Sequence, residues 1–305
     1  MKFLYVFYLS FKSQTIYLAH VYMSIMFALT QVVVLFFFWK AVYTGRTLID
    51  TYTFQDMITY ILMAQIIDLL IFFSIERYIS SQLADGSIGV RLHKPISFPV
   101  YVMFDQMGHT GFRIMTSVLP MFFIVLFFFD VHISLTFIES LVFIFSLIAS
   151  WILLYCIQFI FGLFVFFTMA DGGIRGLRVT LVRLLSGSLV PLSMYPDWLQ
   201  LVVMNIPLKL IYFVPLSILT GKHTSDFANK YDVIHQILIK LGMPSLMAIT
   251  VEIIVWLAVF LLSVNYLWNQ TKRDVVIQGG KDFENPATFL SISKAALCEV
   301  GTVYE

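Results

Sequence analysis

The sequence predicts an all-α integral membrane protein with six transmembrane helices. Of its 305 residues, 60% are hydrophobic and only 12% are charged, whereas a soluble domain carries about 25% charged residues. The hydrophobic residues are also gathered into long runs, and a helix needs about 20 such residues to cross the hydrocarbon core of a bilayer. We therefore expect a multi-pass protein of the cell (inner or plasma) membrane, with lipid around most of the chain.

The first segment, residues 1–20, is expected to form an N-terminal interfacial helix. Lys2 and Lys12 flank a short apolar run. No small-x-small cleavage site follows, so the segment differs from a signal peptide. A disordered start is the alternative. A six-span membrane domain would then occupy residues 21–268, and a polar cytoplasmic tail residues 269–305.

Five apolar runs predict five of the spans. They are Val21–Trp39, Met57–Ile75, Ile114–Phe129, Ser140–Met169 and Ser245–Trp268. At 1.5 Å rise per residue, the fourth run would reach about 45 Å. It is therefore expected to tilt or to project beyond the hydrocarbon.

The stretch Leu184–Gly221 is apolar but interrupted. We expect one span that enters at about Leu184, followed by broken, re-entrant helices on the extracellular side. Irregular backbone at membrane depth is tolerated only where protein or a water-filled cavity satisfies its polar groups. Residues that interrupt this stretch are therefore candidates for a re-entrant gate: Gly187, Pro191, Pro196, Asp197, Pro207 and Pro215.

The distribution of Lys and Arg predicts that both termini are cytoplasmic. With six spans, about twice as many of these residues fall on the cytoplasmic side as outside, as the positive-inside rule requires. A seven-span alternative, in which Leu199–Thr220 crosses the membrane, would place the tail outside.

Motifs for catalysis are missing from the sequence. Neither Gly221–Lys222 nor Gly280–Lys281 is followed by Ser or Thr, so there is no P-loop. The two cysteines and six histidines have no metal-ligand spacing. A net charge of +1 argues against a nucleic-acid partner. We expect neither a cofactor nor a metal on this chain.

Polar residues inside the predicted spans have two interpretations. Gln65 and Asp68 share one face of the second span, and Glu252 lies about one turn into the last span. Buried charge in lipid is costly and often marks a proton or cation pathway. The simpler interpretation is a polar contact between helices or subunits.

The segment between the second and third spans, Glu76–Arg113, is long for a protein otherwise built of short turns. Apolar positions recur at helical spacing after Ile75, and Asp85–Gly86 is typical of a helix end. Pro95 and Pro99 then indicate a turn. The residues alone leave two interpretations open: a short rigid helix that a motor subunit contacts, or an ordinary solvated loop.

Three motifs resemble the permeases of type-2 ABC exporters. Asp85-Gly86, followed by Leu92-His93-Lys94-Pro95-Ile96-Ser97, is similar to the acidic-Gly and Leu-x-[Arg/Lys]-Pro-[Ile/Leu]-Ser pattern of their cytoplasmic loop. Ser186-Gly187 with Pro191-Leu192 and Pro196 is similar to a second family segment, and Asn205–Pro215 followed by Gly221 to a third. The resemblance covers about residues 15–270. His93 departs from it, and the tail after Arg273 has no counterpart.

The resemblance implies a permease subunit without an ATP site of its own. Separate nucleotide-binding ATPase subunits would hold ATP and Mg²⁺, and a second permease subunit, identical or a sibling, would complete the path for an amphipathic, lipid-linked, peptide or drug substrate. A coupling helix would contact the ATPase through Glu76, Arg77, Asp85, Gly86, Lys94 and Pro95. Two alternatives remain open: a secondary transporter that uses Asp68 and Glu252, and an intramembrane enzyme that acts on lipids.

Overall fold

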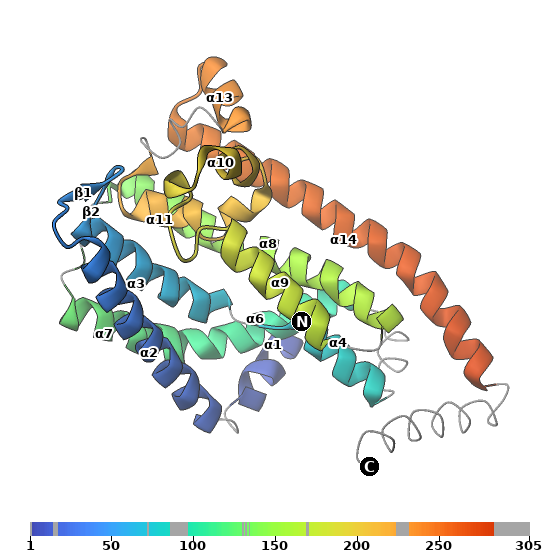
Figure 1. Cartoon of the computed structure of the whole chain (residues 1–305). Helices are drawn as coiled ribbons and strands as arrows, with labels where there is room; N and C mark the ends of the chain where they lie inside the picture. The colour runs from blue at the N-terminus through green and yellow to red at the C-terminus, as the bar shows by residue number, and fades with distance from the viewer. Residues whose placement is uncertain are drawn as a thin grey trace, which may run out of the picture.

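The computed structural model describes residues 2–14, 18–71, 73–85, 97–129, 131, 133, 135–168, 171–223 and 232–283. Within these ranges the chain is helical apart from turns and one hairpin, in which Leu48–Ile49 (β1) pairs antiparallel with Tyr52–Thr53 (β2). The predicted fold class, an all-α membrane protein, is therefore confirmed. The helices lie side by side in one layered bundle (Figure 1).

Five helices among the described residues are long and apolar enough to cross a membrane. They correspond to the five predicted runs and are α2 (Leu18–Val42), α3 (Phe54–Ile71) with α4 (Ile75–Ala84), α6 (Phe98–Arg113) continued by η2 (Ile114–Val118) and α7 (Leu119–Phe128), α8 (Phe137–Thr168), and α14 (Ser245–Phe283). Exposed Phe, Leu, Ile and Met side chains cover much of α2, α7 and α14. Such surfaces are stable where lipid surrounds them.

The interrupted stretch forms short helices, as its prolines predict. They are η3 (Leu192–Met194), α10 (Asp197–Val203), η4 (Pro207–Leu210) and α11 (Phe213–Leu219). The helix α9 (Gly172–Leu185) precedes this stretch, and α13 (Val233–Lys240) follows it. The seven-span alternative needs one continuous helix over Leu199–Thr220, and the structure has breaks there. In Figure 1, α9 runs from the end of the bundle where α4 lies toward the end where α10 and α13 lie.

Among the described residues, no helix long enough to cross a membrane begins at about Leu184: α9 starts at Gly172, ends at Leu185 and is not one of the five long apolar helices, so the sixth predicted span stays a prediction. The three arginines of α9 made this stretch resemble a solvated loop. In the structure two of them meet carboxylates: Arg178 pairs with Glu76, and Arg183 with Asp68. Charges that find partners within the protein do not prevent a helix from packing at membrane depth.

The centre of the bundle is α11. All seven of its residues are buried, and it packs against α3 and α8. Pro215 falls in its first turn, where a missing N–H costs no intrahelical bond. Trp268 stacks on Phe98 and packs edge-on against Phe159, and thereby holds α14 to α6 and α8.

The N-terminal helix α1 (Lys2–Ser13) packs along α6. The Ser10 hydroxyl donates to Asp105 Oδ1 at 2.5 Å, and Phe3 stacks on Phe104. Because α1 covers this polar part of α6, the third span begins at Phe98, well before the predicted start at Ile114. The aromatic side chains of the opposite face of α1 are exposed, among them Tyr5 and Tyr8, as suits a helix at a membrane interface.

Gly108 allows α1 and α6 to approach, and we predict that Gly108→Ala separates them. A Cβ at this position would lie 2.5 Å from the carbonyl oxygen of Phe7 and 2.8 Å from Ser10 Cβ. The matched control is Gly176→Ala on α9, where a Cβ meets nothing within 4 Å. There the removal of a helical glycine should stabilise by about 0.5–1 kcal/mol.

The protease sensitivity of α1 is measured by limited proteolysis, and the stability of each variant by thermal unfolding in detergent. Gly108→Ala should release α1 to protease and unfold at a lower temperature, while Gly176→Ala should do neither. Equal protease resistance in Gly108→Ala and the unchanged protein would contradict the close contact.

Candidate functional site

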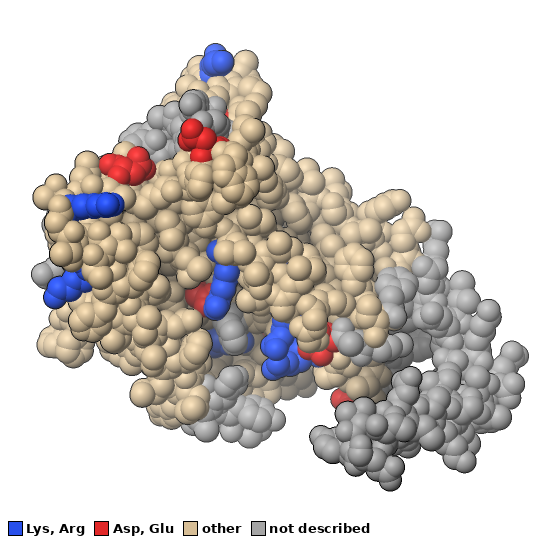
Figure 2. Space-filling view, in the orientation of Figure 1, with Lys and Arg blue, Asp and Glu red and all other residues tan. Residues whose placement is uncertain are grey.

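A groove with charged side chains in a largely apolar wall crosses the face of the bundle formed by α2, α3, η2 and α9. Three neighbouring cavities, of about 290, 230 and 80 Å³, all have Asp68 and Arg183 in their walls. We call the three together the Asp68 groove. Figure 2 shows acidic and basic side chains in a hollow near the middle of this face, surrounded by uncharged surface.

Asp68 is held by two other segments. The Tyr212 hydroxyl donates to its Oδ1 at 2.6 Å, and Arg183 Nη2 lies 3.4 Å from its Oδ2. Gln65, one turn earlier on α3, lines the same two larger cavities. The structure thus brings the predicted Gln65 and Asp68 together on one face. The contacts of Asp68 with α9 and with the turn before α11 favour the interpretation as a contact between segments.

The arginines of α9 were not predicted as site residues, yet Arg175, Arg178 and Arg183 all line the groove. Their spacing places them on one side of a helix, with leucines and valines between them. This periodicity was the signal that could have found them. It was outweighed by three glycines at the start of the segment, which resemble a turn.

The predicted coupling residues are divided between the interior and the surface. Glu76 is fully buried, and its Oε1 accepts from Arg178 Nε at 2.5 Å. It therefore joins α4 to α9 and is not the surface contact that we expected. Arg77 and Asp85 are exposed, and α4 ends at Ala84, as the Asp-Gly pair predicts. Gly86, Lys94 and Pro95 lie outside the described residues.

The predicted gate residues surround α10 and α11. Gly187, Pro191, Pro207 and Pro215 are buried, and each proline stands at or next to the start of a helix or in its first turn. Pro196 and Asp197 are exposed at the start of α10. The prolines thus set where each short helix begins.

Gly187 makes the turn from α9 into this segment possible, and we predict that Gly187→Ala is destabilising. Its φ is +81°, and a Cβ would lie 3.1 Å from Leu192, Phe213 and the Tyr60 hydroxyl. That hydroxyl donates to the Gly187 carbonyl at 2.6 Å. A left-handed backbone with a crowded side chain costs about 1–3 kcal/mol. Thermal unfolding should report it, with Gly172→Ala, where the Cβ meets nothing within 4 Å, as the unaffected control.

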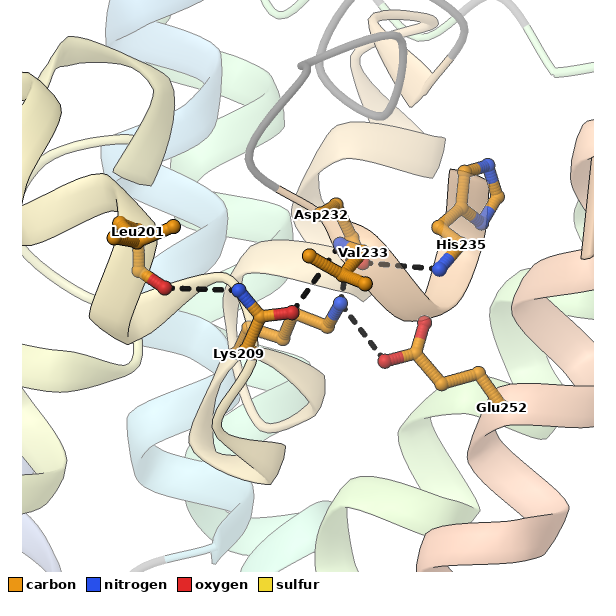
Figure 3. Close-up of polar contacts among 7 residues, drawn as sticks. Leu201, Lys209, Asp232, Val233, His235 and Glu252 are labelled. Atoms are coloured by element: carbon orange, nitrogen blue, oxygen red, sulfur yellow. Dashed lines mark hydrogen bonds and ion pairs between the residues drawn. The ribbon is translucent and has the colours of Figure 1, made fainter. Parts of the chain in front are cut away.

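A buried ion cluster fixes the short helices to the last span (Figure 3). Lys209 Nζ lies 2.5 Å from Asp232 Oδ2 and 2.8 Å from Glu252 Oε1, and all three side chains are at most 1% exposed. Lys209 belongs to η4, Asp232 precedes α13, and Glu252 belongs to α14. The predicted intramembrane Glu252 is therefore paired with the Lys209 ammonium. Asp68 pairs with a different cation, Arg183.

Further contacts organise the surroundings of this cluster. Asp232 Oδ1 accepts from the backbone N–H of His235 at 3.1 Å and so caps α13. Burial lowers the pKa of His235, against the opposite effect of the Asp232 carboxylate, so its imidazole is neutral at pH 7. The Asn205 side chain accepts from the N–H of Val233, which links the turn between α10 and η4 to the start of α13.

Groupings typical of a metal centre do not occur in the part of the chain that the structure describes: no three His, Cys, Asp or Glu side chains are placed to share an ion. The polar groups of the groove and of the Lys209 cluster are instead charged pairs between helices. Paired charges at the protein interior and around a cavity are typical of transport pathways.

Comparison with known proteins identifies the family of this chain. The model of a family described as ABC-2 family transporter protein matches residues 29–279. Neither the curated proteins nor the solved structures contain a match to the chain. The matched region includes the second half of α2, the four later long helices through residue 279, and the segment after α4 in which the resemblance to type-2 ABC permeases was found. The chain belongs to the ABC-2 family of transporters and is a type-2 ABC permease.

Proposed function

We propose that this permease is the membrane subunit of an ATP-driven exporter. It would work with a second permease subunit, identical or a sibling, and with a pair of separate ATPase subunits that bind ATP and Mg²⁺. The observation that carries the proposal is the family match over residues 29–279. ABC-2 permeases are transport components that work with separate ATP-binding subunits.

The position of α4 supports a role in coupling to the ATPase. Its first residues are anchored to the bundle: Glu76 pairs with Arg178, and the Ile75 N–H donates to Gln158 Oε1 at 3.1 Å. Arg77 and Asp85 stay exposed. A force applied to the exposed side of α4 would therefore be transmitted to α8 and α9, because a packed interior deforms little.

The proposed membrane topology has six crossings. Five would be made by the long helices and the sixth by α9 with the segment that follows it, which would return the chain to its starting side. We propose cytoplasmic termini on this basis and on the distribution of Lys and Arg. The α10–α13 segment would then lie on the extracellular side and cap the path there.

The proposed substrate is amphipathic: a lipid-linked, peptide or drug molecule. The Asp68 groove joins apolar side chains of α2 to polar groups of α3 and α9, which is the mixture that such a molecule needs. A proton- or cation-coupled carrier is the alternative. Both of its candidate acids are paired with basic side chains, Asp68 with Arg183 and Glu252 with Lys209, which favours the ATP-driven mechanism.

The test is a mild-detergent pull-down of the tagged chain from its own cells, followed by mass spectrometry and an ATPase assay. A co-purifying subunit with a P-loop is expected. The double variant Arg77→Glu/Asp85→Arg should lose most of the bound subunit and its ATPase activity, while Arg46→Glu, an exposed arginine in the loop after α2, should retain both.

Two outcomes would count against the proposal. A chain that purifies alone and transports in proteoliposomes with a proton gradient and no ATP would be a secondary carrier. Unchanged ATPase binding by the Arg77→Glu/Asp85→Arg variant would remove α4 from the docking surface.

A further inference from the structure

The largest cavity of the Asp68 groove is mostly apolar. Its volume is about 290 Å³, and its apolar wall consists of Val21, Met23, Phe27, Ala28, Leu69 and Phe112. Arg113, Arg183 and Asp68 line it as well. A cavity with a largely apolar wall and a few charged groups suits a ligand of the same two-part character.

Positive charge exceeds negative charge along the groove. Arg113, Arg175, Arg178 and Arg183 line its cavities, whereas Asp68 is the one carboxylate among the described lining residues. Glu76, behind the wall, neutralises Arg178 through a contact of 2.5 Å. With Arg178 set against Glu76 and Arg183 against Asp68, the described lining still holds more arginines than carboxylates.

Arg183 is placed to contact a ligand. It lines all three cavities, and its side chain is 39% exposed. Its contact with Asp68 is long, 3.4 Å, and involves one nitrogen. A guanidinium has five N–H donors in a planar fork that matches carboxylate and phosphate oxygens. Asp68 keeps the Tyr212 hydroxyl at 2.6 Å, so it stays hydrogen-bonded when Arg183 turns toward a ligand.

We propose that the Asp68 groove binds an amphiphile with one anionic headgroup, a carboxylate, sulfate or phosphate, and an apolar chain. The headgroup contacts Arg183 and Arg175, and the chain lies against α2 and Phe112. This inference rests on the proposed transport function and narrows its substrate to anionic amphiphiles. A cationic amphiphile would have to displace Arg183 from Asp68 and then remain among the other arginines, at a high electrostatic cost.

The test measures binding to the full chain in phosphatidylcholine nanodiscs, with no ATPase present. The probe is undecanoic acid with a dansyl group at its far end, detected by energy transfer from the protein's tryptophans, and empty nanodiscs give the lipid background. The matched probe carries a trimethylammonium group in place of the carboxylate. The acid is expected to bind on the order of tenfold tighter than the cation, because a hydrogen bond to a charged group contributes a free energy of that size.

Variants separate the charge of Arg183 from its structural role. Arg183→Gln should weaken binding of the acid on the order of tenfold, and Arg183→Lys should recover part of that loss because the charge returns. Asp68→Asn, which removes the competing carboxylate, should leave binding of the acid equal or tighter. Arg46→Gln, exposed in the loop after α2, is the control and should bind as the unchanged protein does. Thermal unfolding confirms that each variant is folded.

Several outcomes would overturn the inference. The first is that the cationic probe binds more tightly than the acid and that Asp68→Asn abolishes this binding. The second is that folded Arg183→Gln binds the acid as the unchanged protein does. The third is that neither probe binds. Displacement of the acid by millimolar inorganic phosphate would show a site for free anions, not for amphiphiles. Failure of the proposed function is a separate result, because it depends on recovery of the ATPase subunit.

Discussion

Replacement of Lys209 by Met should destabilise the protein by about 3–5 kcal/mol, the cost of a buried ion pair that loses one partner. The ammonium of Lys209 lies between two carboxylates, at 2.5 Å from Asp232 and 2.8 Å from Glu252, in a site closed to solvent. Without it, two buried negative charges face each other, and η4, α13 and α14 lose their common contact. Thermal unfolding in detergent should show a large decrease in midpoint.

A triple variant tests the reason for this loss. Lys209→Met/Asp232→Asn/Glu252→Gln removes all three charges with little change in volume, and it should recover a large part of the stability that Lys209→Met loses. Lys240→Met, an exposed lysine at the end of α13, is the matched control and should change the midpoint little. If Lys209→Met unfolds at the same temperature as Lys240→Met, the cluster does not hold these segments together.

The second large effect is expected at Arg178 and Glu76. Arg178→Met should destabilise by about 3–5 kcal/mol, since Glu76 is then left fully buried without its cation. The loss should also loosen α4 from α9, so ATPase activity of the assembled transporter should respond less to substrate. The measurements are thermal unfolding of the chain and substrate-stimulated ATPase activity of the complex.

A double-mutant cycle isolates this pair. The double variant Arg178→Met/Glu76→Gln should lose much less free energy of unfolding than the sum of the losses in the two single variants. The difference, the coupling energy of the pair, should be about 1–3 kcal/mol. Arg77→Gln, the exposed neighbour on α4, should leave stability unchanged. Additive effects of the two changes would show that Glu76 and Arg178 are stabilised separately.

The sequence predicted the spans well because apolar length decides membrane insertion independently of tertiary contacts. All five apolar runs became long helices, with boundaries that shifted where polar residues found partners: the third span gained Phe98–Arg113 because α1 covers Asp105. The end of α4 was predicted because Asp85–Gly86 is a local signal.

The charged pairs could not be predicted, because each joins residues far apart in the chain. Glu76 was assigned to a docking surface on its place in a loop motif, and only the packing of α9 shows that it is buried. For Lys209, nothing in the neighbouring sequence indicates Asp232 or Glu252 as partners. A hydropathy pattern counts each charge as unpaired, so it underestimates how far α9 continues as a helix.

The Lys209 cluster also sets an order for biogenesis. The chain is made from its N-terminus, so Lys209 leaves the ribosome before either of its carboxylate partners. Until Asp232 and Glu252 follow, a buried ammonium would have no counter-ion, so η4 cannot settle in its final position. Addition of α14 is therefore the step that completes the cluster, because Glu252 is the last of its three members in the chain. A chain that stops before Asp232 would leave Lys209 without either carboxylate, and one that stops between Asp232 and Glu252 would give it one of the two.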